Sequence, residues 1–308
     1  MDEQGFLALV SKKAGSFRPN VCRDLSRTFA KAGIGLRFHY IEDSMAAAEE
    51  IDRAIEAGCR NFLAVGGDGT IGRTASHLYG KPHRLGIIPA GTANTLARIL
   101  GIPLTTGRAI RLAATSSKTR AVDGMDVGGR LYLQNVSTGL SSISLDCLDD
   151  KEKAALGMAS YVIGMARATL KTVPCDYDLT IDGRSVTTRA IEIHVTNTGV
   201  LGTPQYHLNE TSRIDDGRVE VLALSNLSPV TVVDAVFDVL LRRKKRAIRL
   251  IGEGSEIVIR SEQRVAAQGD GDIIGPTPVK ITVRSRAVNF IVSLCAGLFA
   301  VSFGAIDK

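Results

Sequence analysis

The sequence has no tryptophan, and aromatic residues make up only 5% of its 308 residues. Its five cysteines form no Cys-x-x-Cys pair, which argues against a structural zinc site and against a disulfide framework. The chain also lacks the Gly-x-x-x-x-Gly-Lys-Ser/Thr motif of P-loop proteins, so a phosphate site would have to be built differently. The opening MDEQGFLALVSKK is acidic with a short apolar run, which argues against a secretory signal peptide. We therefore expect a reducing, cytoplasmic location.

The composition that is present is that of an ordinary globular protein, with 44% hydrophobic and 23% charged residues. The length suits two domains rather than one. The formal net charge of +6 and the pI near 9.1 favour anionic partners such as nucleotides, phospholipid surfaces or nucleic acid, without choosing among them.

The first third of the chain alternates strand-like and helix-like segments. Apolar runs predict strands, and amphipathic runs that begin near Asn20 and Ser44 and stop at glycines predict helices. Such alternation predicts a parallel sheet with crossover helices. The expected strands are 6–10, 35–41, 61–65 and 84–90, and the expected helices are 21–32, 45–57 and 91–101.

The pattern changes after about residue 120, where short alternating runs separated by turn residues predict a mainly antiparallel β domain. Asp182-Gly183 is a hairpin signal. Two helical stretches, 151–171 and 229–247, interrupt these strands. We therefore predict an α/β domain over residues 1–125 and a β-rich, sandwich-like domain over residues 126–292.

The C-terminal segment 288–306 is almost wholly apolar and close to the length that spans a membrane. The preceding alternation favours a last strand that ends near Val292. We expect residues 293–308 to form a short apolar helix that packs back on the first domain. The alternatives are a membrane span and a tail that dips into a membrane surface.

A glycine-rich turn, GGDGT at residues 66–70, follows the third expected strand and opens a helix. Glycines allow the backbone to approach a phosphate closely, and the helix N-terminus favours an anion. Asp68 would repel bare phosphate, so we expect it to contact Mg²⁺, a ribose hydroxyl or a loop N–H. A tight turn with Asp68 as a local cap is the plainer interpretation of this motif alone.

A second strand–turn–helix, LGIIPAGTANTLARILGIP, comes about 20 residues later. In a parallel sheet both turns lie at the carboxyl edge, where ligands bind. Thr92 could donate its hydroxyl to a phosphate, and Asn94 could fix the loop. The SKKAGS segment after the first strand is a third candidate loop.

The pairing of GGDGT with PAGTANTLAR resembles the diacylglycerol kinase catalytic-domain family, which includes sphingosine kinases, ceramide kinases and soluble bacterial lipid kinases. GGDG alone is shared with NAD kinases and phosphofructokinases, so the second turn is the specific part. The resemblance continues through AVDGMDVGG, RIDDGRVEV and AAQGDGD and covers most of the chain. It implies two domains, with ATP and lipid meeting in the cleft between them.

The resemblance also implies roles for individual residues. Asp272 would be the general base, beside Asp270 in the family's Asp-Gly-Glu position, and a structural magnesium ion would be held around Arg213, Asp216 and Arg218. The implied nucleotide site comprises Ser11, Lys12, Lys13, Ala14, Gly15, Tyr40, Gly66, Gly67, Asp68, Gly69, Thr70, Ile71, Gly72, Thr92, Asn94 and Asp123.

The chain departs from the family pattern in four features. The first loop reads SKKAG instead of Asn-Pro-x-Ser/Ala-Gly, and Gly72-Arg73 stand where Asn-Glu is usual. The base is the shorter Asp272, and two arginines flank the expected metal site. Taken alone, GDGD at residues 269–272 is also good β-turn chemistry.

We therefore expect an ATP- and Mg²⁺-dependent lipid kinase that is cytoplasmic and associates peripherally with anionic membranes. Diacylglycerol is the first expectation for its substrate. The alternatives are a ceramide or sphingoid-base kinase, a metabolite kinase of the NAD kinase type, and a nucleotide- or lipid-binding protein without catalysis. We expect no nucleic-acid partner, and an oligomer is possible.

Two further features carry weaker expectations. The basic run at residues 242–246 is either a solvated helix end or a docking point for anionic headgroups. His194, in IEIHVTN, is expected to be a sheet residue rather than a ligand.

Overall fold

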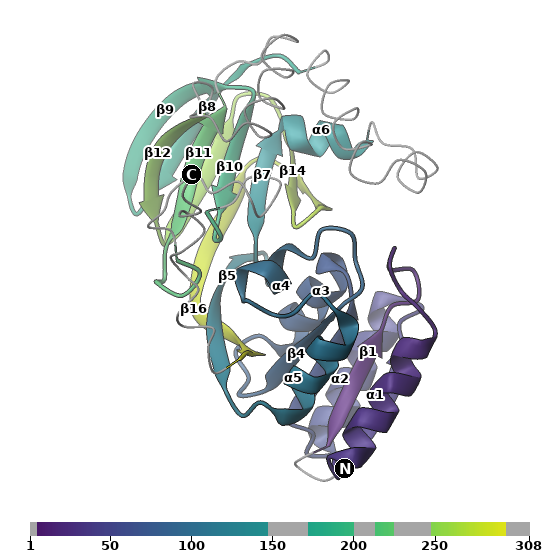
Figure 1. The fold of residues 1–308 in the computed structure, drawn as a ribbon. Coiled ribbons are helices and arrows are strands. Elements are labelled where there is room, and N and C mark those ends of the chain that lie inside the picture. The colour runs from purple at the N-terminus through teal and green to yellow at the C-terminus, as the bar shows by residue number, and fades with distance from the viewer. Residues whose placement is uncertain (1–4, 147–171, 200–212, 225–247, 294–308) are drawn as a thin grey trace, which may run out of the picture. The chain divides into compact units, whose positions relative to one another are not determined.

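The computed structural model describes residues 5–146, 172–199, 213–224 and 248–293 (Figure 1). Within them the chain divides into two compact units. Unit 1 joins the chain up to Val122 with the segment that begins at Arg286, and unit 2 is Asp123–Ser285. Each unit is described by itself below.

Unit 1 is built on a parallel sheet, as the alternating pattern predicts. Its strands follow the order β2-β1-β3-β4, and the last residues of strand β16 run parallel beside β4. Strands β1 and β3 are buried throughout, which is why they read as continuous apolar runs. The strands are β1 (Phe6–Val10), β2 (Leu36–Tyr40), β3 (Asn61–Gly66), β4 (Arg84–Pro89) and β16 (Val279–Ile291).

Five helices connect these strands, and four of them pack in pairs, with α1 against α5 and α2 against α3 (Figure 1). Helix α1 buries Val21, Leu25 and Phe29, the stripe expected at helical spacing. The helices are α1 (Asn20–Lys31), α2 (Ser44–Glu56), α3 (Asp68–Leu78), α4 (Thr95–Ile99) and α5 (Thr106–Thr115).

Helix ends differ from the expectation in three places. Asp43, not Ser44, caps α2, because its carboxylate accepts the N–H of Ala46 at 2.8 Å. Asn20 is the first helical residue of α1, and its side chain makes no cap hydrogen bond. Helix α4 begins at Thr95 instead of residue 91, since Asn94 adopts a left-handed conformation with φ 49°.

Unit 2 is mainly antiparallel, as predicted. One group of strands has the order β16-β13-β8-β9, and a second sheet has the order β12-β11-β10-β7-β14-β15. The elements are β5 (Thr119–Val127), β6 (Arg130–Tyr132), β7 (Asn135–Gly139), α6 (Leu140–Asp146), β8 (Cys175–Ile181), β9 (Arg184–Ala190), β10 (Glu192–Thr196), β11 (Val219–Leu224), β12 (Ile248–Gly254), β13 (Glu256–Ser261), β14 (Ala266–Gly269) and β15 (Asp272–Pro276).

The core of unit 2 joins the two groups of strands. Leu179 and Ile257 of the first group belong to the same buried apolar cluster as Ile193 and Val221 of the second. This packing of sheet on sheet confirms the sandwich-like architecture. The Asp182-Gly183 hairpin between β8 and β9 is also confirmed, with positive φ at both residues.

Three predictions fall outside the described residues. They are the helices over 151–171 and 229–247, the latter with its basic run at 242–246, and the packing of the apolar tail beyond residue 293. Of the helices that the structure does describe, none has the length and apolar character needed to cross a membrane.

Candidate functional site

The two glycine-rich turns of unit 1 meet through their backbones. A Cβ built on Gly91 would lie only 2.5 Å from the Cα of Gly67, so neither turn could approach the other with a larger residue at Gly91. The N–H of Ala90 donates to the carbonyl of Gly66 at 2.8 Å, which extends the β3–β4 pairing into the turns. The structure thus joins the two motifs that the sequence places about 20 residues apart.

Asp68 crosses from the first turn to the second. Its carboxylate oxygens accept the N–H groups of Thr95 and Leu96, each at 3.2 Å, and so cap helix α4. Of the three expected roles, contact with loop N–H groups is therefore the one that the structure shows. No side chain among the described residues caps α3 itself, and an uncapped helix N-terminus favours an anion.

Asn94 fixes the second turn, as expected. Its side-chain oxygen accepts the N–H of Gly91 at 2.9 Å, and its amide nitrogen donates to the carbonyl of Gly91 at 2.8 Å. This closed ring holds the backbone of Gly91 against Gly67. Thr92, within the same turn, lies near the first loop: a Cβ on Gly15 would be 3.3 Å from its Oγ1.

The first loop, Ser11–Gly15, is tied to the same edge of the sheet. The N–H of Ser11 donates to the carbonyl of Val65 at 2.9 Å, at the end of β3. Lys12 and Lys13 are exposed, and the Nζ of Lys12 lies 4.2 Å from the ring centroid of Tyr40. A hydrogen bond with the Cys22 side chain raises the pKa of Tyr40.

Gly72 and Arg73, where the chain leaves the family pattern, lie in the second turn of α3. The Nε of Arg73 donates to the carbonyl of Gly69 at 3.2 Å, and its Nη1 donates to Ser44 Oγ at 3.3 Å. The guanidinium thus lies over the glycine turn and connects it to the start of α2. It adds a positive charge to this edge.

Asp123 belongs to unit 2, whereas the other residues of the expected nucleotide site belong to unit 1. It is fully buried, and its carboxylate accepts the N–H of Gly217 at 2.5 Å. Its backbone N–H donates to the carbonyl of Ile214 at 2.8 Å. The structure thus connects Asp123 to the turn expected to hold the metal.

The turn expected to hold magnesium would supply one carboxylate, from Asp216, together with backbone oxygens from around Arg213 and Arg218. The carboxylate of Asp216 accepts the N–H of Arg218 at 3.0 Å, and Arg213 pairs with Asp215 at 3.3 Å. In the ranges that the structure describes, no three His, Cys, Asp or Glu side chains gather as metal ligands. The assignment of Arg213, Asp216 and Arg218 to a metal stays a prediction, and we derive no step from it.

The two acids of the late Asp-Gly-Asp turn have different surroundings. The carboxylate of Asp270 accepts three backbone N–H groups, from Leu133 at 2.8 Å, Gln134 at 3.0 Å and Asn135 at 2.9 Å. It therefore ties the turn to the β6–β7 connection. Asp272, at the start of β15, has a side chain that is 41% exposed and forms an ion pair with Arg130.

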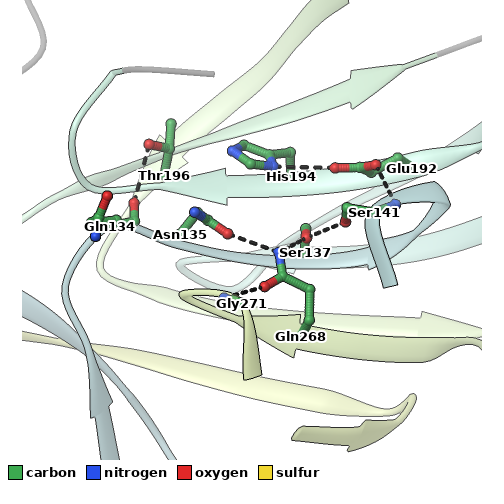
Figure 2. A network of polar contacts seen from close by, with 9 residues as sticks. All are labelled: Gln134, Asn135, Ser137, Ser141, Glu192, His194, Thr196, Gln268 and Gly271. Carbon is green, nitrogen blue, oxygen red and sulfur yellow. Dashed lines mark hydrogen bonds and ion pairs between the residues drawn. The ribbon is translucent and has the colours of Figure 1, made fainter. Parts of the chain in front are cut away.

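A polar network extends from this turn across the second sheet of unit 2 (Figure 2). Gln268 is its branching point, because its side chain contacts Gly271, Asn135 and Ser137. His194 lies in β10, as expected of a sheet residue, and its Nδ1 is 3.2 Å from Glu192 Oε1. Sequence reasoning missed Gln268, although its place beside the GDGD turn was a signal.

Comparisons with known proteins identify the families that the two parts of the chain match. Residues 6–127 match the family described as the diacylglycerol kinase catalytic domain, and residues 134–292 match the YegS C-terminal NAD kinase beta sandwich-like domain. A protein named "Probable lipid kinase YegS-like" from Enterobacter sp. (strain 638) is 28% identical over 295 residues, which are 93% of this chain and 95% of that protein.

Two further matches are a sequence relative, which supports the family, and a solved structure, which supports the fold. A protein of the same name from Serratia proteamaculans (strain 568) is 40% identical over 139 residues, 42% of this chain and 45% of its own length. The crystal structure of a diacylglycerol kinase from Bacillus anthracis str. Sterne superposes with a TM-score of 0.77 at 21% identity, covering 96% of this chain and 99% of that one. At 21% identity the superposition is evidence for the fold alone.

Proposed function

The chain belongs to the diacylglycerol kinase catalytic-domain family, and from that premise we propose that it transfers the γ-phosphate of magnesium-bound ATP to the hydroxyl group of a lipid. Membership makes it a kinase of the phosphotransferase class. The observation that carries the proposal furthest is the backbone contact between Gly67 and Gly91, which joins two phosphate-type turns at the carboxyl edge of the parallel sheet.

The donor nucleotide would bind along this edge of unit 1. Its triphosphate would lie on the turn at residues 66–70, where the uncapped N-terminus of α3 presents backbone N–H groups. The hydroxyls of Thr70 and Thr92 are additional donors in the same turns. Lys12, in the first loop beside Tyr40, would supply positive charge to the phosphates.

Asp272 is the proposed general base. A lipid hydroxyl is a poor nucleophile at neutral pH, and a carboxylate within hydrogen-bond reach accepts its proton as attack proceeds. The new bond forms between the hydroxyl oxygen and the γ-phosphorus, and the bond from that phosphorus to the bridging oxygen of ADP breaks. Of the two acids, Asp272 suits this role better, because the carboxylate of Asp270 is engaged by three backbone N–H groups.

We propose diacylglycerol as the first candidate acceptor, with ceramide or a sphingoid base as the alternative. The activity is tested by incubating the purified protein with γ-labelled MgATP and, in separate mixed vesicles, diacylglycerol, ceramide and sphingosine. A further tube holds NAD in place of lipid. Label in one lipid class supports the kinase and identifies its acceptor. Label only in NAD supports the metabolite kinase instead, and nucleotide binding without label in any tube contradicts catalysis.

We also propose that the protein works at an anionic membrane surface on the cytoplasmic side. The net charge of +6 and the five consecutive basic residues at 242–246 favour attraction to anionic headgroups, worth about 1 kcal/mol for each Lys or Arg near the surface. Neutralising residues 242–246 should weaken sedimentation with vesicles of phosphatidylglycerol and leave activity on detergent-dispersed lipid unchanged. Equal sedimentation of the two proteins would contradict this docking.

A further inference from the structure

Polar side chains form a row across three neighbouring strands of the second sheet in unit 2. His194 of β10 lies directly opposite Ser137 of β7, and Ser137 lies directly opposite Gln268 of β14 (Figure 2). All three are at least nine-tenths buried. Buried polar groups are costly unless they are hydrogen-bonded, so this row calls for an explanation beyond packing.

Gln268 uses both ends of its amide. Its Oε1 accepts the backbone N–H of Gly271 at 2.8 Å. Its Nε2 donates to Asn135 Oδ1 at 2.9 Å and to Ser137 Oγ at 2.6 Å. We call Gln268 and these three partners the Gln268 clamp. A glutamine at this position satisfies one donor and two acceptors at once, which a glutamate or a leucine cannot do.

The clamp acts on the residue between the two acids of the late turn. Gly271 has φ +89° and Asp270 has φ +49°, conformations that L-residues seldom adopt, so the direction of the chain into Asp272 depends on how this turn is held. Asp270 holds the turn from one side through its three backbone hydrogen bonds. Gln268 holds the central N–H from the strand.

The row continues away from the turn to a buried acid–imidazole pair. Ser137 Oγ lies 2.6 Å from Ser141 Oγ, and the N–H of Ser141 donates to Glu192 Oε2 at 2.9 Å. The other oxygen of Glu192 lies 3.2 Å from Nδ1 of His194. Each member thus limits the rotation of the next, and the clamp is anchored on side chains that are themselves fixed.

We propose that Gln268 is a positioning residue for Asp272, which orients the base by holding the N–H of Gly271. The inference rests on the proposed function, in which Asp272 accepts the proton of the lipid hydroxyl. Misplacement of a reacting group by about 1 Å can cost about a hundredfold in rate. Loss of the clamp should therefore lower turnover far more than it weakens nucleotide binding.

The test compares Gln268→Leu, Gln268→Glu and the wild-type protein. Gln268→Leu removes every bond of the clamp, and we expect kcat to fall about tenfold to a hundredfold with the KM for MgATP unchanged. Gln268→Glu keeps an oxygen for Gly271 and should recover part of the loss. Gln263→Leu makes the same chemical change at an exposed position and should behave as wild type. An unchanged kcat in Gln268→Leu would overturn the proposal.

A second measurement separates positioning from lost stability and from the absence of kinase activity. Ile281→Val weakens the buried core of the same unit without touching the clamp, and it should lower the Tm but not kcat. If it lowers kcat as Gln268→Leu does, stability explains the effect and the proposal fails. Amide exchange needs no substrate: the N–H of Gly271 should exchange about tenfold faster or more in Gln268→Leu than in wild type. Equal exchange rates would refute the clamp even if no lipid is phosphorylated.

Discussion

The tripeptide Gly-Asp-Gly occurs in both units, at residues 67–69 and at residues 269–271. In each case the aspartate binds backbone N–H groups of a distant segment. Asp68 holds the start of α4 in unit 1, and Asp270 holds the β6–β7 connection in unit 2. The same three letters therefore encode the same structural device twice, and in neither turn does the central aspartate stand out as the reacting group.

The difference lies in what each turn presents. The first is closed by contact between two glycine backbones, and it leaves the N-terminus of α3 without a side-chain cap. The second is closed by the amide of Gln268 and continues into Asp272, whose carboxylate is partly exposed. Under the proposed function, one turn receives the phosphates of the nucleotide and the other receives the proton of the lipid hydroxyl. Function thus depends on the neighbours of the motif more than on the motif.

The sharpest test of this contrast is Asp272→Asn. An amide cannot take up the proton, so we expect kcat to fall by about 10²–10⁴-fold with the KM for MgATP little changed. The free energy of unfolding should change by less than about 1 kcal/mol, because the ion pair with Arg130 is partly exposed. Asp176→Asn removes another exposed, ion-paired acid of the same unit and serves as the control. Near-normal turnover of Asp272→Asn would show that the base lies elsewhere.

Gly91→Ala tests the other turn. Its Cβ would lie 2.5 Å from the Cα of Gly67, so the two turns must separate. We expect the KM for MgATP to rise about tenfold or more, and stability to fall by about 1–3 kcal/mol, as for other overpacked sites. In Gly107→Ala the added Cβ meets nothing within 4 Å, so this variant should bind nucleotide normally. Its free energy of unfolding should rise by up to about 1 kcal/mol, because alanine favours a helix over glycine. Unchanged nucleotide affinity in Gly91→Ala would contradict the proposal that the two glycine turns bind the nucleotide.

Much of the fold could be predicted from the sequence, because strand and helix periodicity are local properties. The parallel sheet, the antiparallel second unit and the Asp182-Gly183 hairpin followed from such patterns. Helix α5 was missed, since its short run TGRAIRLAAT has no side-chain cap to mark its start. The late start of α4 was missed because the left-handed conformation of Asn94 depends on its ring of hydrogen bonds with Gly91.

The candidate site was predictable as motifs but not as contacts. Three partners for Asp68 remained open, and the backbone N–H of Thr95 that it binds lies 27 residues further along the chain. Gln268 meets Ser137 across 131 residues, and their pairing depends on the register of β14 against β7. Register is determined by the packing of whole strands, and no local pattern around Gln268 contains it.

The paired capping roles can be compared directly with Asp68→Asn and Asp270→Asn. An asparagine keeps one acceptor oxygen but loses the charge and the second acceptor. We therefore expect Asp270→Asn, with three hydrogen bonds at stake, to lower the free energy of unfolding by about 2–3 kcal/mol, and Asp68→Asn by about 1–2 kcal/mol. Urea denaturation measures both. If Asp68→Asn leaves stability intact but removes the response to magnesium, its carboxylate acts on the metal and the parallel between the turns is wrong.

The smallest expected effect concerns acid stability, which should differ between the units. In unit 1, burial against Phe62, together with the charges of Arg60 and Lys81, lowers the pKa of His83 below its ordinary 6.5. As the pH drops below about 6.5, His83 is therefore protonated in the unfolded chain while it is still neutral in the folded unit. The free energy of unfolding should fall over this range and level off below the folded pKa.

In unit 2, the N–H groups of Glu256 and Ser255 lower the pKa of Asp182. Its contribution is present above the ordinary pKa of 3.8 and is lost only as the pH falls through the lower, folded value. Unit 1 should therefore loosen at a higher pH than unit 2 in amide exchange. His83→Phe keeps the ring contact with Phe62 and removes the titrating nitrogen, so it should flatten the dependence of stability on pH just below about 6.5. An unaltered slope would assign the acid sensitivity of unit 1 to another group.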